Sequence, residues 1–501
     1  MPSGEINNKA VSAVKWAAVG TVTKFGVQLA AQVVLARLLG PENYGLFAMG
    51  LVVLTLSNFL ADFGFSWALV QNQHLTKEDV RFAFTWQLIS GAVATAALYF
   101  LAPWIAAYFN EPRLEPIVRW LSLSCLIGAI TAPGSNLLRR NLDFRWLNII
   151  QIASYIFGYL CIGIPLAYSG AGVWTLVSAW IAQSFCAFVL TMIRSPHSMK
   201  PLFWYHGARS STNMGSTVFI TNLCNWMLNN LDRVFLGRFL NAHAVGIYSV
   251  GYNLANTPNS LFITALQPAF LATGAKLQDD PGRLREAYLS VIATIWIVIA
   301  PMFILLALVA NDFVVVLYGS KWTSSGVVLS ILALSMPAYI TWGMSTPILW
   351  NTGGKHLESM LQLPILCVSA VSFYLFSSLG ITVVALIAAA TMLMRALVIS
   401  TVACQRLKIT FSDLFPILGR GAIIIAIAAV TSYSGGWLGH ALWQGSFAPF
   451  VLGALAGSGS VVTVSFIHPR LLGNKVVGML GKFSPPIPIR LNTYLRNRCM
   501  G

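Results

Sequence analysis

The stretch NNLDRVFLGRFLNAHAVGIYSVG, residues 229–251, decides the fold because an earlier stretch, VLARLLGPENYGLFAMG at 34–50, matches its C-terminal part. At an offset of 201 residues the matched pairs are Leu35 and Leu236, Arg37 and Arg238, Leu39 and Leu240, Gly45 and Gly246, and Gly50 and Gly251. Shared arginine and glycine are more specific than shared leucines in apolar sequence. The chain therefore contains an internal repeat.

The composition is that of a membrane protein. Of the 501 residues, 57% are hydrophobic and only 9% are charged, whereas soluble domains carry about 25% charged residues. Apolar windows of about 20 residues, the length of one membrane-spanning helix, recur along nearly the whole chain. The net charge of +16 lies in short loops and not in a separate domain, which argues against nucleic acid as a partner.

The apolar windows predict fourteen transmembrane helices. Their expected ranges are 10–38, 43–68, 82–109, 114–137, 146–168, 171–193, 210–238, 243–272, 286–311, 325–351, 358–378, 380–404, 412–434 and 446–467. Six helices separate the two repeat copies, and because this number is even, both copies insert with the same orientation. The predicted fold class is an all-α polytopic membrane protein, with two parallel six-helix lobes and two added C-terminal helices. The expected domains are the lobes at 1–195 and 196–405, the last two helices at 406–468, and a basic cytoplasmic tail at 469–501.

Lysine and arginine are distributed unevenly among the loops. The loops that follow even-numbered helices are rich in these residues, and the loops that follow odd-numbered helices contain few. Cytoplasmic loops carry the excess of positive charge, so both termini are expected in the cytoplasm. The tail contains PRLLGNKVVGMLGKF (469–483), a basic amphipathic segment that is expected to lie on the anionic cytoplasmic leaflet.

Polar side chains form stripes along the first, seventh and eighth predicted helices, at 100° per residue. The stripe residues are Lys24, Gln28 and Gln32; Asn222, Asn225, Asn229 and Arg233; and Asn253 and Asn256. The second stripe repeats the first at the offset of 201 residues. Amides and charges lose their water when they face lipid, so we expect these stripes to line a wet cavity between the lobes and to bind substrate. The alternative is that they hold helices together.

Ionisable residues inside the membrane are the strongest functional candidates. Lys24 lies near mid-bilayer, about 21 Å along its helix, and is predicted to contact the substrate. Arg395 and Arg420 are either further cavity cations or are bonded to backbone carbonyls. Asp62 and Asp232 are candidate ion-coupling acids that carry a proton or Na⁺, or that pair with a neighbouring arginine.

The sequence contains no recognisable catalytic or metal-binding motif. No histidine accompanies a plausible nucleophile, and neither G-x-x-x-x-G-K-[ST] nor H-E-x-x-H occurs. The seven cysteines are scattered and lack metal-ligand spacing. We therefore predict neither an enzyme nor a cofactor, and we expect an ion gradient, of H⁺ or Na⁺, as the energy source.

A series of motifs resembles the polysaccharide transporter family of O-antigen and exopolysaccharide flippases, within the multidrug/oligosaccharidyl-lipid/polysaccharide exporter superfamily. The motifs are VLARLLGPENYGLFAMG (34–50), LADFGF (60–65), NLLRRNLDFRWLN (136–148), NNLDRVFLGRFL (229–240), VGIYSVGYNLANTP (245–258) and LYGSKWTSSGVVLSILAL (317–334). The resemblance covers about residues 10–410 and does not include the tail.

The resemblance implies a function in the bacterial inner membrane. It implies translocation of undecaprenyl-diphosphate-linked oligosaccharide to the periplasmic leaflet, with the polysaccharide polymerase and chain-length machinery as candidate partners beside the bilayer. It also implies alternating access between two lobes, driven by an ion gradient. The alternatives are a lipid II flippase, a multidrug exporter, and, from other classes, a membrane polysaccharide polymerase or ligase or a structural scaffold. The sequence does not identify the glycan, the coupling ion or the oligomeric state.

Overall fold

The computed structural model describes residues 3–61, 69, 76–205, 216–277, 280–473 and 476. These residues form helices and connecting loops and contain no strand. Eleven helical segments among them are long and apolar enough to cross a membrane. The predicted all-α polytopic fold class is confirmed. The chain divides into two compact units, Met1–Val218 with Leu236–Gly246, and Phe219–Phe235 with Ile247–Gly501.

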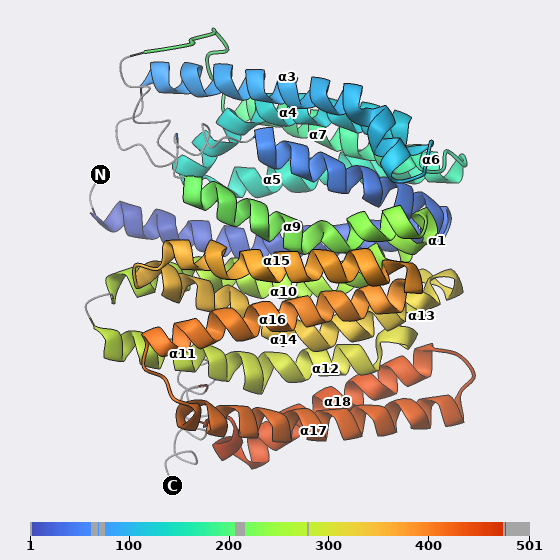
Figure 1. Cartoon of the computed structure of the whole chain (residues 1–501), viewed down its shortest axis with the longest axis vertical. Coiled ribbons are helices and arrows are strands. Elements are labelled where there is room, and N and C mark those ends of the chain that lie inside the picture. The colour runs from blue at the N-terminus through green and yellow to red at the C-terminus, as the bar shows by residue number, and fades with distance from the viewer. Residues whose placement is uncertain are drawn as a thin grey trace. The chain divides into compact units, whose positions relative to one another are not determined.

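The first unit is a group of long helices that pack side by side (Figure 1). They are α1 (Ser3–Ala61), α3 (Lys77–Tyr108), α4 (Leu114–Arg140), α7 (Trp174–Arg194) and one span formed by α5 (Phe144–Tyr155), the π-helix η1 (Ile156–Gly163) and α6 (Ile164–Tyr168). Within α1, Gly40 has φ 73° and ψ 174°, a conformation that favours glycine, and Pro41 follows it. This break separates the first two predicted helices. The end of the second, residues 62–68, lies outside the described residues.

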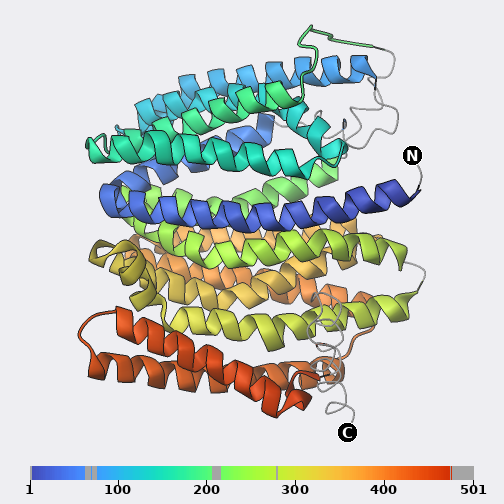
Figure 2. The ribbon, with the colours of Figure 1, turned by 180° about the vertical axis from the view of Figure 1, so that it is seen from behind.

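The second unit is arranged around α14 (Thr323–Asn351), whose residues 335–349 are all buried. Its other helices are α11 (Pro281–Thr294), η2 (Ile295–Ile299), α12 (Ala300–Leu308), α13 (Ala310–Tyr318), α15 (Lys355–Phe376), α16 (Ile381–Arg406), α17 (Phe411–Leu442) and α18 (Phe447–Ile467). Helices α9 (Ser216–Phe239) and α10 (Ala242–Lys276) contribute residues to both units. Figure 2 shows α17 and α18 as an antiparallel pair.

The end of α17 and the presence of α13 differ from the prediction. Helix α17 continues to Leu442, eight residues beyond the predicted end at 434. The glycines of SYSGGWLGH, expected in a loop, let α18 approach: a Cβ on Gly435 would lie 2.6 Å from the Leu452 carbonyl oxygen. Small residues at a helix contact allow backbones to pack closely in membranes. The short helix α13 was not predicted.

Repeat-related glycines pack against each other within the first unit. A Cβ atom added to Gly45 would lie 1.6 Å from the carbonyl oxygen of Ala242, and one added to Gly246 would lie 1.9 Å from that of Pro41. Pro41 and Ala242 are also 201 residues apart. The contact is therefore symmetric under the sequence repeat, and the two segments approach so closely that neither site has room for a side chain.

The next repeat-related glycine pair makes equivalent contacts, each inside its own unit. In the first unit, a Cβ on Gly50 would meet side chains of α4, 2.8 Å from Leu121. In the second unit, a Cβ on Gly251 would meet α14, 2.7 Å from the Ser325 carbonyl oxygen. Helices α4 and α14 are the fourth and tenth predicted spans, six apart, so the packing follows the repeat.

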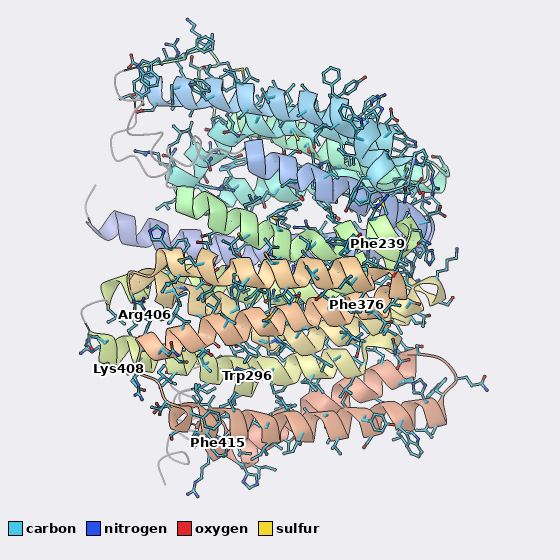
Figure 3. The ribbon with its side chains drawn as sticks, in the orientation of Figure 1. Phe239, Trp296, Phe376, Arg406, Lys408 and Phe415 are labelled. Carbon is cyan, nitrogen blue, oxygen red and sulfur yellow. The ribbon has the colours of Figure 1, made fainter. Side chains whose placement is uncertain are left out.

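Basic side chains gather at one end of the second unit. Arg285 pairs with Asp413 at 2.7 Å, and Arg406 Nη1 donates to the Thr352 carbonyl oxygen at 3.1 Å. Figure 3 shows Arg406 and Lys408 at this end of the helices and Phe376 at the opposite end. These loops are the ones that the charge distribution assigns to the cytoplasm, and that assignment stays a prediction.

Candidate functional site

A buried arginine is the centre of a polar cluster in the second unit. Arg395 of α16 is only 1% exposed. Its Nη1 donates to Asn229 Oδ1 at 3.0 Å, and its Nη2 donates to Asn225 Oδ1 at 2.7 Å. A buried charge is stable only when it is hydrogen-bonded or paired, and α9 supplies these acceptors. The structure thus brings together three residues that the sequence predicted as site residues.

Aromatic side chains of α14 cover the guanidinium group. The Arg395 Cζ atom lies 3.9 Å from the ring centre of Trp342 and 5.6 Å from that of Tyr339. The Tyr339 hydroxyl also donates to Asn229 Oδ1 at 3.0 Å. Cation–π contacts of this kind are strongest when the cation is desolvated, so the aromatic pair stabilises the charged form of Arg395.

The cluster also contains a buried acid. Glu358 of α15 is 1% exposed. Its Oε1 accepts from Gln362 Nε2 at 3.0 Å, and its Oε2 accepts from Trp350 Nε1 at 2.7 Å. Gln362 Oε1 in turn accepts from Arg395 Nη2 at 3.2 Å. The acid and the arginine are thereby linked through an amide.

Asp232 and Arg233 adjoin this cluster on α9 and have separate partners. Asp232 is 3% exposed; its Oδ2 accepts from the Tyr248 hydroxyl at 2.6 Å, and its Oδ1 accepts from the backbone N–H of Arg233 at 2.8 Å. The Arg233 guanidinium lies 4.1 Å from the ring centre of Tyr252 and donates to Asn230 at 3.3 Å. The two neighbouring charges thus point to different partners, as their 100° separation on a helix predicts.

The polar stripe of the first unit contains a bonded lysine. Lys24 Nζ donates to Gln151 Oε1 of α5 at 2.8 Å, and its side chain is half-buried. Gln28 and Gln32 are also half-buried on α1. Gln151 was not among the predicted residues. It is a polar residue in the apolar helix α5, which is the signal that could have identified it.

The remaining predicted residues do not join the Arg395 cluster. Asn222 and Asn253 are exposed, and Asn256 Oδ1 accepts from Asn259 Nδ2 at 2.8 Å. Arg420 is exposed on α17, where its guanidinium lies beside Gly473. Asp62 lies outside the described residues.

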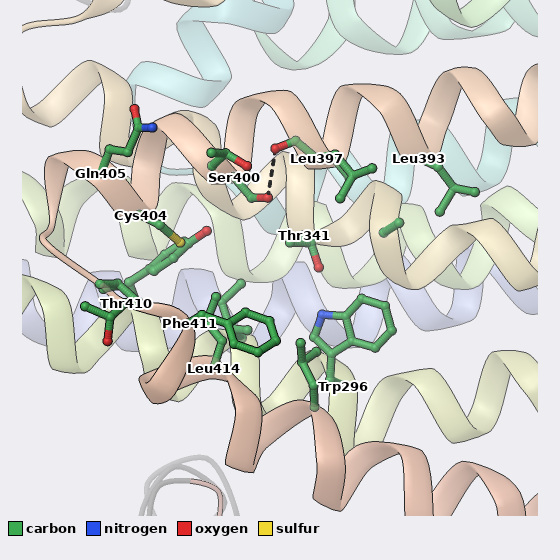
Figure 4. Close-up of a pocket in the computed structure, with 17 residues that line it drawn as sticks. Trp296, Thr341, Leu393, Leu397, Ser400, Cys404, Gln405, Thr410, Phe411 and Leu414 are labelled. Atoms are coloured by element: carbon green, nitrogen blue, oxygen red, sulfur yellow. Dashed lines mark hydrogen bonds between the residues drawn. The ribbon is translucent and has the colours of Figure 1, made fainter.

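A largely apolar cavity of about 530 Å³ lies elsewhere in the second unit, between η2, α14, α16 and α17. Trp296, Leu397 and Leu414 form part of its wall (Figure 4). The predicted site residues do not line it, so the cavity is distinct from the polar cluster.

The clusters can bind anions and hydroxyl groups. Guanidinium and ammonium groups are donors that recognise phosphate oxygens, and side-chain amides both donate to and accept from hydroxyls. Within the described ranges, no three histidine, cysteine, aspartate or glutamate side chains are grouped as metal ligands.

Comparison with known proteins identifies the family. The family model described as polysaccharide biosynthesis protein matches residues 34–327, more than half of the chain. The chain belongs to this polysaccharide biosynthesis family. Among curated members, it is 26% identical over 335 residues to the lipopolysaccharide biosynthesis protein WzxC of Escherichia coli K12, covering 66% of this chain and 67% of WzxC. It is 24% identical over 331 residues to the succinoglycan biosynthesis transport protein ExoT of Rhizobium meliloti, covering 66% and 67%.

Solved structures show that this family member shares its fold with known transporters. The lipid II flippase MurJ superposes with a TM-score of 0.73 at 15% identity, over 91% of this chain and 98% of MurJ. A multidrug resistance MATE transporter of the MOP superfamily superposes with a TM-score of 0.60 at 13% identity, over 78% and 98%. Identities this low establish the fold alone.

Sequence reasoning missed the residues that complete the cluster, namely Glu358, Gln362, Tyr339, Trp342 and Trp350. Glu358 stands at the first residue of the predicted helix 358–378, where an acidic residue is typical of a helix N-terminus. Gln362, four residues later, lies on the same face. This spacing of two polar residues in an apolar helix is the signal that could have identified Glu358 and Gln362; the three aromatic residues of α14 carry no such signal.

Proposed function

We propose that this protein is a flippase, not an enzyme, for undecaprenyl-diphosphate-linked oligosaccharide units. It moves them from the cytoplasmic to the periplasmic leaflet of the bacterial inner membrane, for polysaccharide biosynthesis. The observation that carries the proposal is a buried, amide-bound Arg395 inside the apolar helices of a polysaccharide biosynthesis family member. Movement is driven by an ion gradient through alternating access between the two lobes.

The polar groups suit the two parts of this substrate. A diphosphate is best bound by fixed positive charge in a low-dielectric site, and Lys24, Arg233 and Arg395 provide such charge. Neutral sugars need groups that both donate and accept hydrogen bonds. The asparagines of α9 and α10 and the glutamines of α1 supply them.

Other substrates fit these groups less well. A multidrug exporter for organic cations needs exposed acids in its binding region, whereas the acids in and beside the Arg395 cluster, Glu358 and Asp232, are buried and hydrogen-bonded. Lipid II also carries a diphosphate and a glycan. Its transport should therefore be compared directly with that of the undecaprenyl-diphosphate-linked oligosaccharide. The names of WzxC and ExoT refer to lipopolysaccharide and succinoglycan biosynthesis, which favours a polysaccharide precursor.

Export in cells tests the proposal. Deleting the gene should abolish surface polysaccharide and leave lipid-linked units on the cytoplasmic leaflet, and restoring the gene should reverse both effects. Arg395→Met should fail to restore export at normal protein level. Arg283→Met, at an exposed arginine that pairs with Asp280, is the matched control and should restore it. Normal export in the deleted strain would rule the proposal out.

A further inference from the structure

Glu358 and Arg395 form a pair of buried opposite charges that are joined by amides instead of by direct contact. Gln362 donates from Nε2 to Glu358 Oε1 at 3.0 Å, and its Oε1 accepts from Arg395 Nη2 at 3.2 Å. Asn225 of α9 makes a second bridge, because its Oδ1 accepts from the same Nη2 at 2.7 Å and its side chain also bonds to Glu358.

Among the side chains that the structure describes, the cation that acts on Glu358 is Arg395. Its direct hydrogen-bond partners, Gln362, Asn225 and Trp350, are all neutral donors. The ionisable groups around the cluster, in the part of the chain that the structure describes, are Arg395 on α16, Tyr339 on α14, Tyr252 on α10, Cys224 on α9, and the adjoining Asp232 and Arg233 of α9. On α15 itself, His356 is exposed. Because Arg233 acts on Asp232, the described cation that compensates the charge of Glu358 is Arg395, through the amide dipoles.

Adding a proton to Glu358 changes which hydrogen bonds the side-chain amides of Gln362 and Asn225 can form. A carboxylic acid must donate its O–H, and the side-chain acceptors in reach are the oxygens of Gln362 and Asn225. Those two oxygens already accept from Arg395. If an amide turns its oxygen towards Glu358, it presents its NH₂ group to the guanidinium, and two donors then face each other. The proton and Arg395 thus compete for the same acceptors.

We propose that Glu358 is a proton-binding site and that proton uptake there releases Arg395 from its amide acceptors on α9 and α15. The role of this site in a transport cycle rests on the flippase function proposed above. One proton is gained by the carboxylate, and the positive charge of Arg395 is left without its counter-charge. Anion binding near Arg395 and proton binding at Glu358 must then favour each other, because such coupling is reciprocal.

The ligand of this site is a proton and not Na⁺. Both carboxylate oxygens of Glu358 already accept from N–H groups, and these donors would face a bound metal ion with their hydrogens. Alkali and alkaline-earth cations are bound by sets of oxygen ligands, and here the amide oxygens point to Arg395. The proposed site therefore couples a polysaccharide flippase to H⁺.

Infrared difference spectroscopy on the full-length protein in lipid nanodiscs tests proton binding. Acidification should produce a carboxylic C=O stretching band that disappears in Glu358→Gln, shifts but persists in Glu358→Asp, and remains in Asp232→Asn. Exchanging K⁺ for Na⁺ at constant pH should leave the band unchanged. A Glu358→Gln spectrum identical to wild type, or a band removed by Na⁺, would overturn the proposal.

The emission of Trp342, which stacks on Arg395, tests the release step. The fluorescence difference between wild type and Trp342→Phe should change with pH at the same midpoint as the infrared band, and this change should be lost in Glu358→Gln. A titrating band without a change at Trp342 would contradict the release of Arg395. Neither measurement involves transport: an intact titration without substrate flipping would refute the proposed function alone, and flipping without titration would refute the proton site alone.

Discussion

Replacing either glycine of the symmetric contact by alanine should separate the two repeat copies in the first unit. A Cβ on Gly246 would stand 1.9 Å from the Pro41 carbonyl oxygen, and one on Gly45 would stand 1.6 Å from that of Ala242. Real Cβ contacts essentially never fall below 3.0 Å, so the segments must move apart by about 1 Å or more. Overpacking typically costs about 1–3 kcal/mol. We expect the upper end, because both obstacles are backbone atoms.

Thermal unfolding of the purified variants measures this cost. Gly26→Ala is the matched control on α1, because a Cβ there meets nothing within 4 Å and alanine favours the helix. Gly45→Ala and Gly246→Ala should lower Tm by several degrees relative to this control. The double variant should cost less than the sum of the single variants, since one separation relieves both overlaps. A wild-type Tm for Gly246→Ala would refute the close contact.

Three further changes test other parts of the structure. Lys24→Ala and Lys24→Glu should reduce polysaccharide export about tenfold or more, because a charged hydrogen bond is worth about 1.5–3 kcal/mol; undiminished export at normal protein level would remove Lys24 from the site. Tyr248→Phe should destabilise the protein by about 1–3 kcal/mol in thermal unfolding, since Asp232 loses its buried donor, and Asp232→Asn should recover part of that loss. In the loop between α3 and α4, the hydrogen bond from Arg113 holds the pKa of Glu111 below its usual value. Its stabilising effect is therefore present above the usual carboxyl pKa and is lost as the pH falls through the lowered pKa, so Glu111→Gln should lower Tm at neutral pH and have no effect at acid pH.

The fold could be predicted from the sequence because each span is long, apolar and bounded by polar loops or by glycine and proline. The predicted gap between residues 38 and 43 contains the Gly40–Pro41 break in α1, and the offset of 201 residues revealed the repeat. The length of α17 could not be predicted in the same way. Glycines that signal a turn in one sequence allow close helix packing in another, and the Gly435 contact with α18 depends on a neighbour that the sequence does not position.

The candidate site was predicted in part. The α9 stripe gave Asn225 and Asn229 because amides four residues apart share a helix face. Their role as acceptors for Arg395 could not be predicted, because it depends on which helix packs beside α9. For the same reason Arg420, which looks equivalent to Arg395 in sequence, lies exposed on α17. The sequence analysis did not select Glu358, because it is the first residue of the predicted helix 358–378 and an acidic residue is common at a helix N-terminus.

Reconstituted flipping tests the central claim most directly. Purified protein in liposomes should move undecaprenyl-diphosphate-linked oligosaccharide between leaflets, as measured by its accessibility to an enclosed or external glycosidase, and faster than it moves lipid II. An imposed pH gradient should accelerate this movement, and Arg395→Met should slow it to the rate of protein-free liposomes. Equal rates with and without the protein, or a preference for lipid II, would contradict the account.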